Sequence, residues 1–178
     1  MTDVLYGTPA PAWLDASATA RLERRLELGL RRARASGSTT LVSFTARVDR
    51  GVDPTAVVCA SRRVGEPWVC LEQPDRDGAA LAALGCAHKL EARGPGRFKD
   101  VAAQWRSVTA AAIADPADGP AGSGLAALGG FAFSPTGGAS PQWAGFAPAS
   151  LIVPELSLAR RGEDVRLTLN LHAAPDDT

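Results

Sequence analysis

Two segments in which apolar and polar residues alternate constrain the fold of this chain more than any other feature of its sequence. Residues 39–48 carry an apolar side chain at every second position from Val42, and residues 165–171 do the same from Val165. A period of two is typical of a strand with one face against a core. The Arg- and Gly-containing turn at 160–163 precedes the second segment, so we expect an antiparallel sheet built partly from hairpins.

Shorter apolar runs predict the remaining strands. Residues 56–60 and 68–71 flank a polar stretch with Gly and Pro, which favours a hairpin. Residues 79–84 are interpreted as a short helix. Further strands are expected over residues 85–92, 125–133 and 151–158, the second of them buried and the last forming a hairpin with residues 165–171.

Two longer segments have the periodicity of amphipathic helices. The first begins near Asp15 or Ser17, either of which can cap it, and ends at residues 36–38. Its arginines alternate with glutamates, which favours a solvated helix face over an anion-binding patch. The second helix lies between residues 94–96 and 115–116, with apolar residues at spacings of 3 and 4 along one face. We expect that face to pack against something apolar.

This element order predicts an α+β fold, a mainly antiparallel sheet with flanking helices. The 178 residues fit one domain with a core, or one part of a larger protein. We expect a loose N-terminal leader over residues 1–14, a single scaffold domain over 15–172, and a linker or truncated end over 173–178.

Composition excludes several classes of function. Nineteen Lys and Arg residues balance nineteen Asp and Glu residues, which argues against a broad basic surface for nucleic acids or anionic membranes. No apolar run approaches the length of a transmembrane helix, and no signal sequence is recognisable. The three cysteines form no C-x-x-C pair, so we expect a reduced, cytoplasmic chain.

No motif in the sequence carries catalytic chemistry. Residues 122–127 match a loose G-x-G-x-x-A pattern, but the strand before it and the helix after it that nucleotide binding requires are missing. Cys86 and His88 share a strand face without further ligands, and a buried structural role is favoured for them. His172 has no evident partner, Lys89 is expected to be protonated, and the acidic residues lie in turns. Cys59 and Cys70 are predicted to be core residues on opposing strands.

Glycines at 129 and 130 interrupt an apolar strand with the sequence GGFAF. Glycine inside a strand marks a bulge, a bend or a close approach of another backbone. We expect this segment to pack against another layer.

The order of several short motifs resembles the N-terminal region of isochorismate synthases. Each motif is short, and their order and spacing carry the resemblance, which runs from residue 39 to residue 171. The motifs are Asp53-Pro54, Gly65-Glu66-Pro67-Trp68, Gly85, Gly96-Arg97-Phe98 with Trp105, residues 129–133, Trp143 and Val153-Pro154-Glu155-Leu156.

The resemblance implies the N-terminal part of the sandwich fold of chorismate-utilising enzymes such as anthranilate synthase component I. It implies an intact Mg²⁺-dependent isomerase that converts chorismate to isochorismate for menaquinone or siderophore biosynthesis. In that family a lysine activates water, an acid protonates the departing hydroxyl and glutamates hold the metal, all in a later, chorismate-binding region. No position here matches those groups, so neither Lys89 nor Lys99 is assigned to them. The expectation is no catalytic, cofactor-binding or metal-binding residue in this chain.

Two interpretations of function remain open. In the first, the chain is the N-terminal segment of an isochorismate synthase, inactive by itself. In the second, it is a non-catalytic partner-binding domain, or half of a split enzyme related to anthranilate, aminodeoxychorismate or salicylate synthase. Its partner would then be the separate chorismate-binding half. Whether the chain is itself an enzyme is left open by its sequence.

Overall fold

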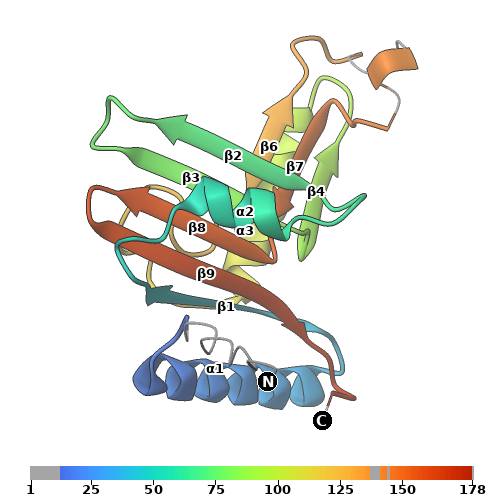
Figure 1. Cartoon of the computed structure of the whole chain (residues 1–178). Coiled ribbons are helices and arrows are strands. Elements are labelled where there is room, and N and C mark those ends of the chain that lie inside the picture. The colour runs from blue at the N-terminus through green and yellow to red at the C-terminus, as the bar shows by residue number, and fades with distance from the viewer. Residues whose placement is uncertain (1–12, 137–140, 144, 178) are drawn as a thin grey trace, which may run out of the picture.

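The chain forms two β-sheets and three helices in the computed structural model, which describes residues 13–136, 141–143 and 145–177 (Figure 1). The larger sheet has six strands, in the spatial order β2 (Trp68–Gln73), β3 (Ala79–Leu84), β8 (Leu156–Arg161), β9 (Asp164–Ala173), β1 (Thr40–Arg47) and β5 (Ile113–Ala114). The smaller sheet has the order β4 (His88–Ala92), β7 (Ala149–Val153) and β6 (Leu128–Phe131).

All strand pairs are antiparallel except β1 with β5, so the larger sheet is mixed. The helices are α1 (Ala16–Ser36), α2 (Pro54–Ser61) and α3 (Arg97–Ala111), and a short 3₁₀ turn covers Pro141–Trp143. The predicted α+β class with a mainly antiparallel sheet is therefore confirmed. No helix in the described part of the chain has the length and apolarity needed to span a bilayer.

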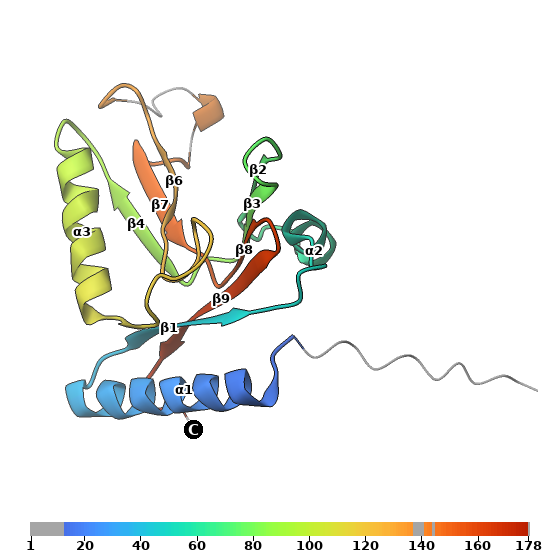
Figure 2. The same ribbon diagram turned by 90° about the vertical axis from the view of Figure 1, so that its left-hand side faces the viewer.

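Helix α1 packs on β1 and β9, as Figure 2 shows, and its start is the one that the sequence predicts. Asp15 Oδ1 accepts a hydrogen bond of 2.7 Å from the backbone N–H of Ala18, which satisfies one free amide of the first turn. Gly29 makes the contact with the sheet close, because an added Cβ there would lie 2.5 Å from Val42 Cγ2. The apolar side of α1 thus faces the sheet, and its arginines lie mostly at the exposed side.

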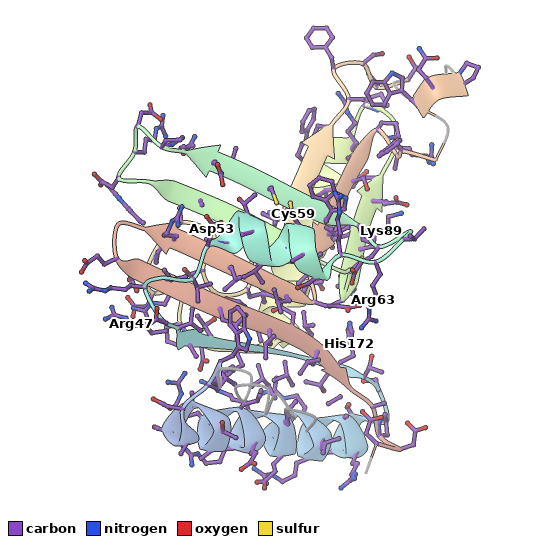
Figure 3. The ribbon with its side chains drawn as sticks, viewed as in Figure 1. Arg47, Asp53, Cys59, Arg63, Lys89 and His172 are labelled. Carbon is purple, nitrogen blue, oxygen red and sulfur yellow. The ribbon has the colours of Figure 1, made fainter. Side chains whose placement is uncertain are left out.

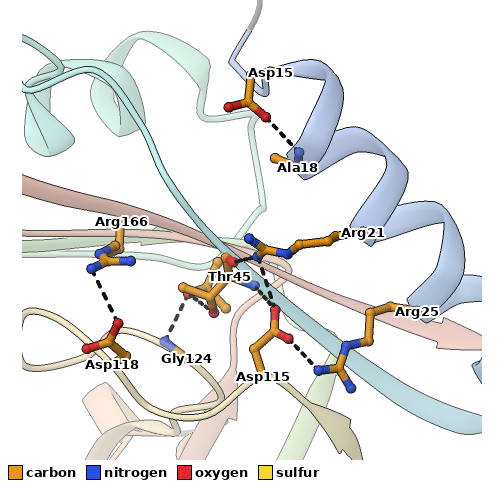
Figure 4. Close-up of polar contacts among 10 residues, drawn as sticks. Asp15, Ala18, Arg21, Arg25, Thr45, Asp115, Asp118, Gly124 and Arg166 are labelled. Atoms are coloured by element: carbon orange, nitrogen blue, oxygen red, sulfur yellow. Dashed lines mark hydrogen bonds and ion pairs between the residues drawn. The ribbon is translucent and has the colours of Figure 1, made fainter.

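Asp115 ties α1 to the sheet (Figure 4). Its Oδ1 lies 2.6 Å from Arg25 Nη2, and its Oδ2 accepts a hydrogen bond of 2.9 Å from the backbone N–H of Thr45. Arg21 Nη2 lies 3.7 Å from the same carboxylate. One carboxylate directly after β5 therefore contacts both α1 and β1.

On the opposite face of the larger sheet, β1 and β9 carry polar side chains that are buried. Thr45 Oγ1 and Thr168 Oγ1 lie 3.1 Å apart, and the backbone N–H of Gly124 donates to Thr168 Oγ1 at 3.0 Å (Figure 4). The loop between β5 and β6 thus covers this face through hydrogen bonds. Residues 122–127 belong to that loop and precede strand β6, which agrees with the rejection of a nucleotide-binding turn.

The type of secondary structure predicted for two segments is wrong. Residues 56–60 lie in helix α2 and not in a strand, because Asp53 accepts a hydrogen bond from the N–H of Ala56 and Pro54 occupies the first helical turn. Residues 79–84 form strand β3 and not a helix. This alanine-rich segment pairs with β2 on one side and β8 on the other, where small side chains suit a strand buried between neighbours. The predicted hairpin of residues 56–60 with residues 68–71 is therefore wrong, and β2 pairs with β3 instead.

The predicted strand at 151–158 is divided between the two sheets. Pro154 and Glu155 separate β7 from β8, and the side-chain amide of Asn170 donates to the carbonyl of Pro154 at 2.7 Å. The N–H of Asn170 also donates to the carbonyl of Glu155 at 2.8 Å. Only the β8 part forms the expected hairpin with β9. The strand expected at 85–92 begins at His88.

The segment 125–133 is strand only from Leu128 to Phe131. The prediction that it is buried is wrong, because Gly129, Gly130 and Phe131 are exposed to solvent. The leader expected at 1–14 falls almost wholly on residues 1–12, which lie outside the described residues. At the other end, Arg34 Nη2 donates to the carbonyl of Asp177 at 2.7 Å, so residues 174–177 contact α1.

Candidate functional site

A large apolar hollow lies between the smaller sheet and the beginning of β2. Its volume is about 890 Å³. In Figure 2, β6 and β7 stand on one side of this region and β2 on the other. The residues that line it are mostly apolar, and they include Trp68, Leu128, Phe131, Trp143, Phe146 and Ile152. Such a hollow is a default candidate for binding in a protein.

The aromatic residues at the rim of the hollow are unusually exposed. Phe133 is fully exposed, Phe146 is 63% exposed and Trp143 is 55% exposed. Trp143 and Phe146 contact each other edge to face, with ring centroids 6.0 Å apart. Contiguous apolar surface of this kind marks an interaction site, because water contact with it is unfavourable.

The strand register explains which side chains reach the hollow. Leu128 is opposite Ile152 and Gly130 is opposite Ser150, and all four line the hollow. The alternate residues of β7, among them Leu151, pack on the other face against α3. Among the described residues, a helix covers one face of the smaller sheet, and the hollow lies at its other face.

Gly129 allows β6 to lie close against β7. A Cβ on this residue would run into the carbonyl oxygen of Ser150 and would lie 2.8 Å from Leu151 Cα. Gly130 differs, because an added Cβ there would meet nothing within 4 Å. The expectation of close backbone approach at the Gly-Gly pair is therefore fulfilled at Gly129, where the neighbour is β7.

A buried arginine holds the chain where it leaves β6. Arg97 is only 4% exposed, and its Nη2 donates to the carbonyls of Ala132 at 2.8 Å and Phe133 at 3.1 Å. The guanidinium carbon also lies 4.4 Å from the centroid of the Phe98 ring, within cation–π range. The Phe98 ring in turn stacks on Phe131 at 4.7 Å. Arg97 and Phe98 thus hold residues 131–133, which line the hollow.

The residues weighed for catalysis lie elsewhere, around the start of β4. Cys86 Sγ is 3.6 Å from the carbonyl of His88, and burial raises the pKa of this thiol, with Glu155 adding to the effect and Lys89 opposing it. His172 has a partner that its sequence does not reveal, since its Nε2 lies 2.8 Å from the carbonyl oxygen of Ala87. The rings of His88 and His172 are 6.0 Å apart. Each histidine or thiol contact found here fits a structural role.

Lys89 lies on β4, as Figure 3 shows, and its Nζ is 2.6 Å from Glu91 Oε1. This hydrogen bond raises the pKa of the Lys89 ammonium, which agrees with the expectation of a protonated side chain. The same contact lowers the pKa of Glu91. Lys99 is exposed on α3. Neither lysine lines the hollow.

Cys59 is exposed on α2, close to β2 in Figure 3, so its predicted place in the core is wrong. The cause is the helix that replaces the expected strand. Cys70 is half-buried on β2, and burial, followed by the neighbouring Cys59, raises the pKa of its thiol. The three cysteines are free thiols.

Divalent metal ions such as Mg²⁺ require several oxygen ligands that converge on one point. Among the described residues, no three His, Cys, Asp or Glu side chains come together in such a group. The donor set of the described part does not fit a Mg²⁺ site, and no chemical step is assigned to a metal here. The expectation of no metal-binding or catalytic residue stays a prediction.

The hollow itself was not foreseen from the sequence. The sequence contains a usable signal, because Phe133, Trp143 and Phe146 fall in a stretch that is otherwise rich in Gly, Pro and Ser. Large aromatic residues in such a loop have no element of their own to pack on. They therefore point to a surface outside the local fold.

Comparison with known proteins places the chain in a family. Residues 28–178 match the model of a family described as chorismate binding enzyme. The chain is also 31% identical over 156 residues to the salicylate biosynthesis isochorismate synthase of Pseudomonas aeruginosa. That match covers 88% of this chain but only 31% of the relative, so the chain spans less than a third of the protein it resembles. The chain belongs to the chorismate-binding enzyme family.

Proposed function

We propose that this chain is the N-terminal scaffold of an isochorismate synthase, which converts chorismate to isochorismate when a chorismate-binding region is joined to it. The observation that carries the proposal is the similarity of most of the chain to less than a third of an isochorismate synthase. The chemistry then belongs to the part of the enzyme that has no counterpart here. By itself the chain is expected to be inactive.

The surface of the chain supports a scaffold role. The apolar hollow and its exposed aromatic rim would be costly to leave in water, at roughly 25 cal/mol for each Å² of apolar area. A second layer of protein over the hollow would remove that cost. Scaffold and catalytic region would then form one continuous core, with the hollow at their boundary.

The side chains of the described residues also support a scaffold whose catalytic groups lie in another region of the enzyme. An attacking water requires a base, and the Lys89 ammonium is held protonated by Glu91. His172 and Cys86 are engaged by backbone carbonyls. If the chain had a catalytic centre of its own, we would expect at least one such group in or beside the hollow.

The name of the relative refers to salicylate biosynthesis. We propose the same first step, chorismate to isochorismate, for the intact enzyme to which this chain belongs, in menaquinone or siderophore biosynthesis. We further propose that the enzyme works in the cytoplasm and that its catalytic region binds Mg²⁺. The free state of all three cysteines agrees with a reducing compartment.

A chimeric enzyme tests the proposal. The chain would replace the matched segment of the Pseudomonas aeruginosa isochorismate synthase, and isochorismate formation from chorismate and Mg²⁺ would be measured. The chimera should be active, whereas the chain alone and the remaining region alone should be inactive. Turnover by the purified chain, or a folded chimera without activity, would contradict the proposed function.

The second candidate is a partner-binding domain or half of a split chorismate-utilising enzyme, and the exposed rim of the hollow favours it. The two candidates differ in how the catalytic region is attached. If the chain and a separately expressed catalytic region regain activity when they are mixed, covalent continuity is unnecessary and the split enzyme is favoured. Activity only in the fused protein favours the continuous enzyme.

A further inference from the structure

Four strands lie at the edges of the two sheets, and three of them are protected against further pairing. Edge strands carry free N–H and C=O groups, and proteins usually block them with charge, proline, short length or a covering element. Strand β2 carries Glu72 and lies between Pro67 and Pro74. Strand β4 carries Lys89 and Glu91. Strand β5 has only two residues.

Strand β6 is the unprotected edge. Its sequence, Leu-Gly-Gly-Phe, has no charged residue and no proline, and it pairs only with β7 among the described residues. Both glycines are exposed, and Phe131 is 43% exposed. An apolar, exposed edge of this kind is a template for another strand.

The hydrogen-bond pattern shows which groups are free. The N–H of Ala132 donates to the carbonyl of Pro148 at 2.7 Å, which fixes the phase of the β6–β7 ladder. In an antiparallel pair the inward and outward groups alternate, so Leu128 and Gly130 bond to β7 while the groups of Gly129 and Phe131 point outward. No described residue hydrogen-bonds to those outward groups.

We propose that β6 pairs edge to edge with a strand from the chorismate-binding region of the same enzyme, so that the smaller sheet continues across the boundary between scaffold and catalytic region. This inference rests on the proposed function. The relative has more than two thirds of its length outside the match, which is ample for such a strand. The apolar hollow beside β6 receives the side chains on one face of the added strand.

A second copy of the chain fits less well. Two copies related by a twofold axis present the same surface to each other. The hollow of about 890 Å³ adjoins β6, so in such a pair one hollow would face another and much of the aromatic rim would stay in contact with water. A different segment with a convex apolar face fills the hollow instead.

Hydrogen–deuterium exchange at single-residue resolution tests the pairing. The amides of Gly129 and Phe131 should exchange rapidly in the isolated chain and at least about 100-fold more slowly in the chimera described above. Should the chimera be insoluble, the same measurement on the Pseudomonas aeruginosa enzyme, at the two aligned positions, gives the answer. Free exchange in the intact protein overturns the inference.

Two variants of one residue separate the backbone from the side chain. Phe131→Ala and Phe131→Pro both remove the ring, but only proline removes the outward N–H. In the chimera, the proline variant should let Gly129 exchange about 10-fold faster than the alanine variant does, because one interface hydrogen bond is lost. Equal exchange in the two variants counts against the pairing.

The measurements keep this inference distinct from the proposed function. An active chimera with freely exchanging Gly129 and Phe131 amides refutes the pairing and leaves the function standing. A folded but inactive chimera in which the Gly129 and Phe131 amides exchange slowly refutes the proposed function and supports the pairing. Protection that grows as the isolated chain is concentrated, together with a dimer in sedimentation, would assign the edge to a second copy and overturn the proposed occupant.

Discussion

Arg97 Nη2 donates a hydrogen bond of 2.8 Å to the backbone carbonyl of Ala132, which joins the first turn of α3 to the chain leaving β6. Arg97 is 4% exposed, and its Nε has no hydrogen-bond partner among the described residues. A charged group is costly to bury. This arginine therefore has a role that an apolar residue cannot fill, namely satisfying two carbonyls at the hollow.

Replacing Arg97 by methionine tests that role. Methionine keeps much of the stem but leaves the carbonyls of Ala132 and Phe133 without their donor, so the free energy of unfolding should fall by about 2 kcal/mol. Urea denaturation measures the loss. Arg106→Met, at an exposed position of the same helix, should change stability very little and serves as the control. Equal effects of the two changes would contradict the assigned role.

The two neighbouring glycines of β6 should respond differently to alanine. Gly129→Ala forces a Cβ against the backbone of Ser150 and Leu151, and should cost about 2 kcal/mol or more. Gly130→Ala adds a methyl group in open space and should be close to neutral. Thermal unfolding of both variants measures the difference. If Gly130→Ala is the more damaging change, the described register of β6 is wrong.

Asp115 should contribute measurably to stability through its contacts with Arg25 and Thr45. Asp115→Asn removes the negative charge and so both ion pairs with α1, and we expect a loss of about 1–2 kcal/mol at neutral pH. Glu27→Gln removes an exposed pair with Arg31 and should have almost no effect. Chemical denaturation of the two variants side by side decides the point.

The three thiols should react with iodoacetamide in a defined order. Cys59 is exposed and should be modified first. Burial raises the pKa of the Cys70 and Cys86 thiols, so their reactive thiolate forms at higher pH and their modification should accelerate only as the pH rises further. Mass spectrometry of the modified peptides follows each site. Cys59→Ser should abolish the fast phase, and a fast phase that survives would refute the order.

The isolated chain should bind a hydrophobic dye at the hollow. Replacing Trp143 and Phe146 together by serine should reduce the fluorescence of bound anilinonaphthalene sulfonate at least about twofold, because both rings form the rim. Leu28→Gln on α1, a comparably exposed apolar position outside the hollow, is the control. A dye signal that is unchanged by the double replacement places the binding elsewhere.

Local sequence patterns predicted the elements that a short stretch of sequence determines by itself, through an alternating pattern or a capping residue. The alternation at 39–48 and 165–171 became β1 and β9, and the cap at Asp15 marks the start of α1. The patterns failed where neighbours decide the outcome. Residues 79–84, rich in alanine, become a strand because β2 and β8 flank them, a contact that no short window contains.

The candidate site was the least predictable part. Residues from β2, β6, β7 and the loop before β7 meet at the hollow, although they are separated by many positions along the chain. The Gly-Gly pair indicated a close approach, but its sequence could not show that β7 is the neighbour at Gly129. The family resemblance, in contrast, rested on the order of short motifs, and it was confirmed by the family match over residues 28–178.

The passage from β7 to β8 through Pro154 and Glu155 has a mechanical consequence. One nearly unbroken segment belongs to both sheets, and Asn170 on β9 fastens its corner with two hydrogen bonds. Separating the sheets would require this corner to open, so we expect the two sheets to unfold together. The chain should then lose its structure in a single cooperative step.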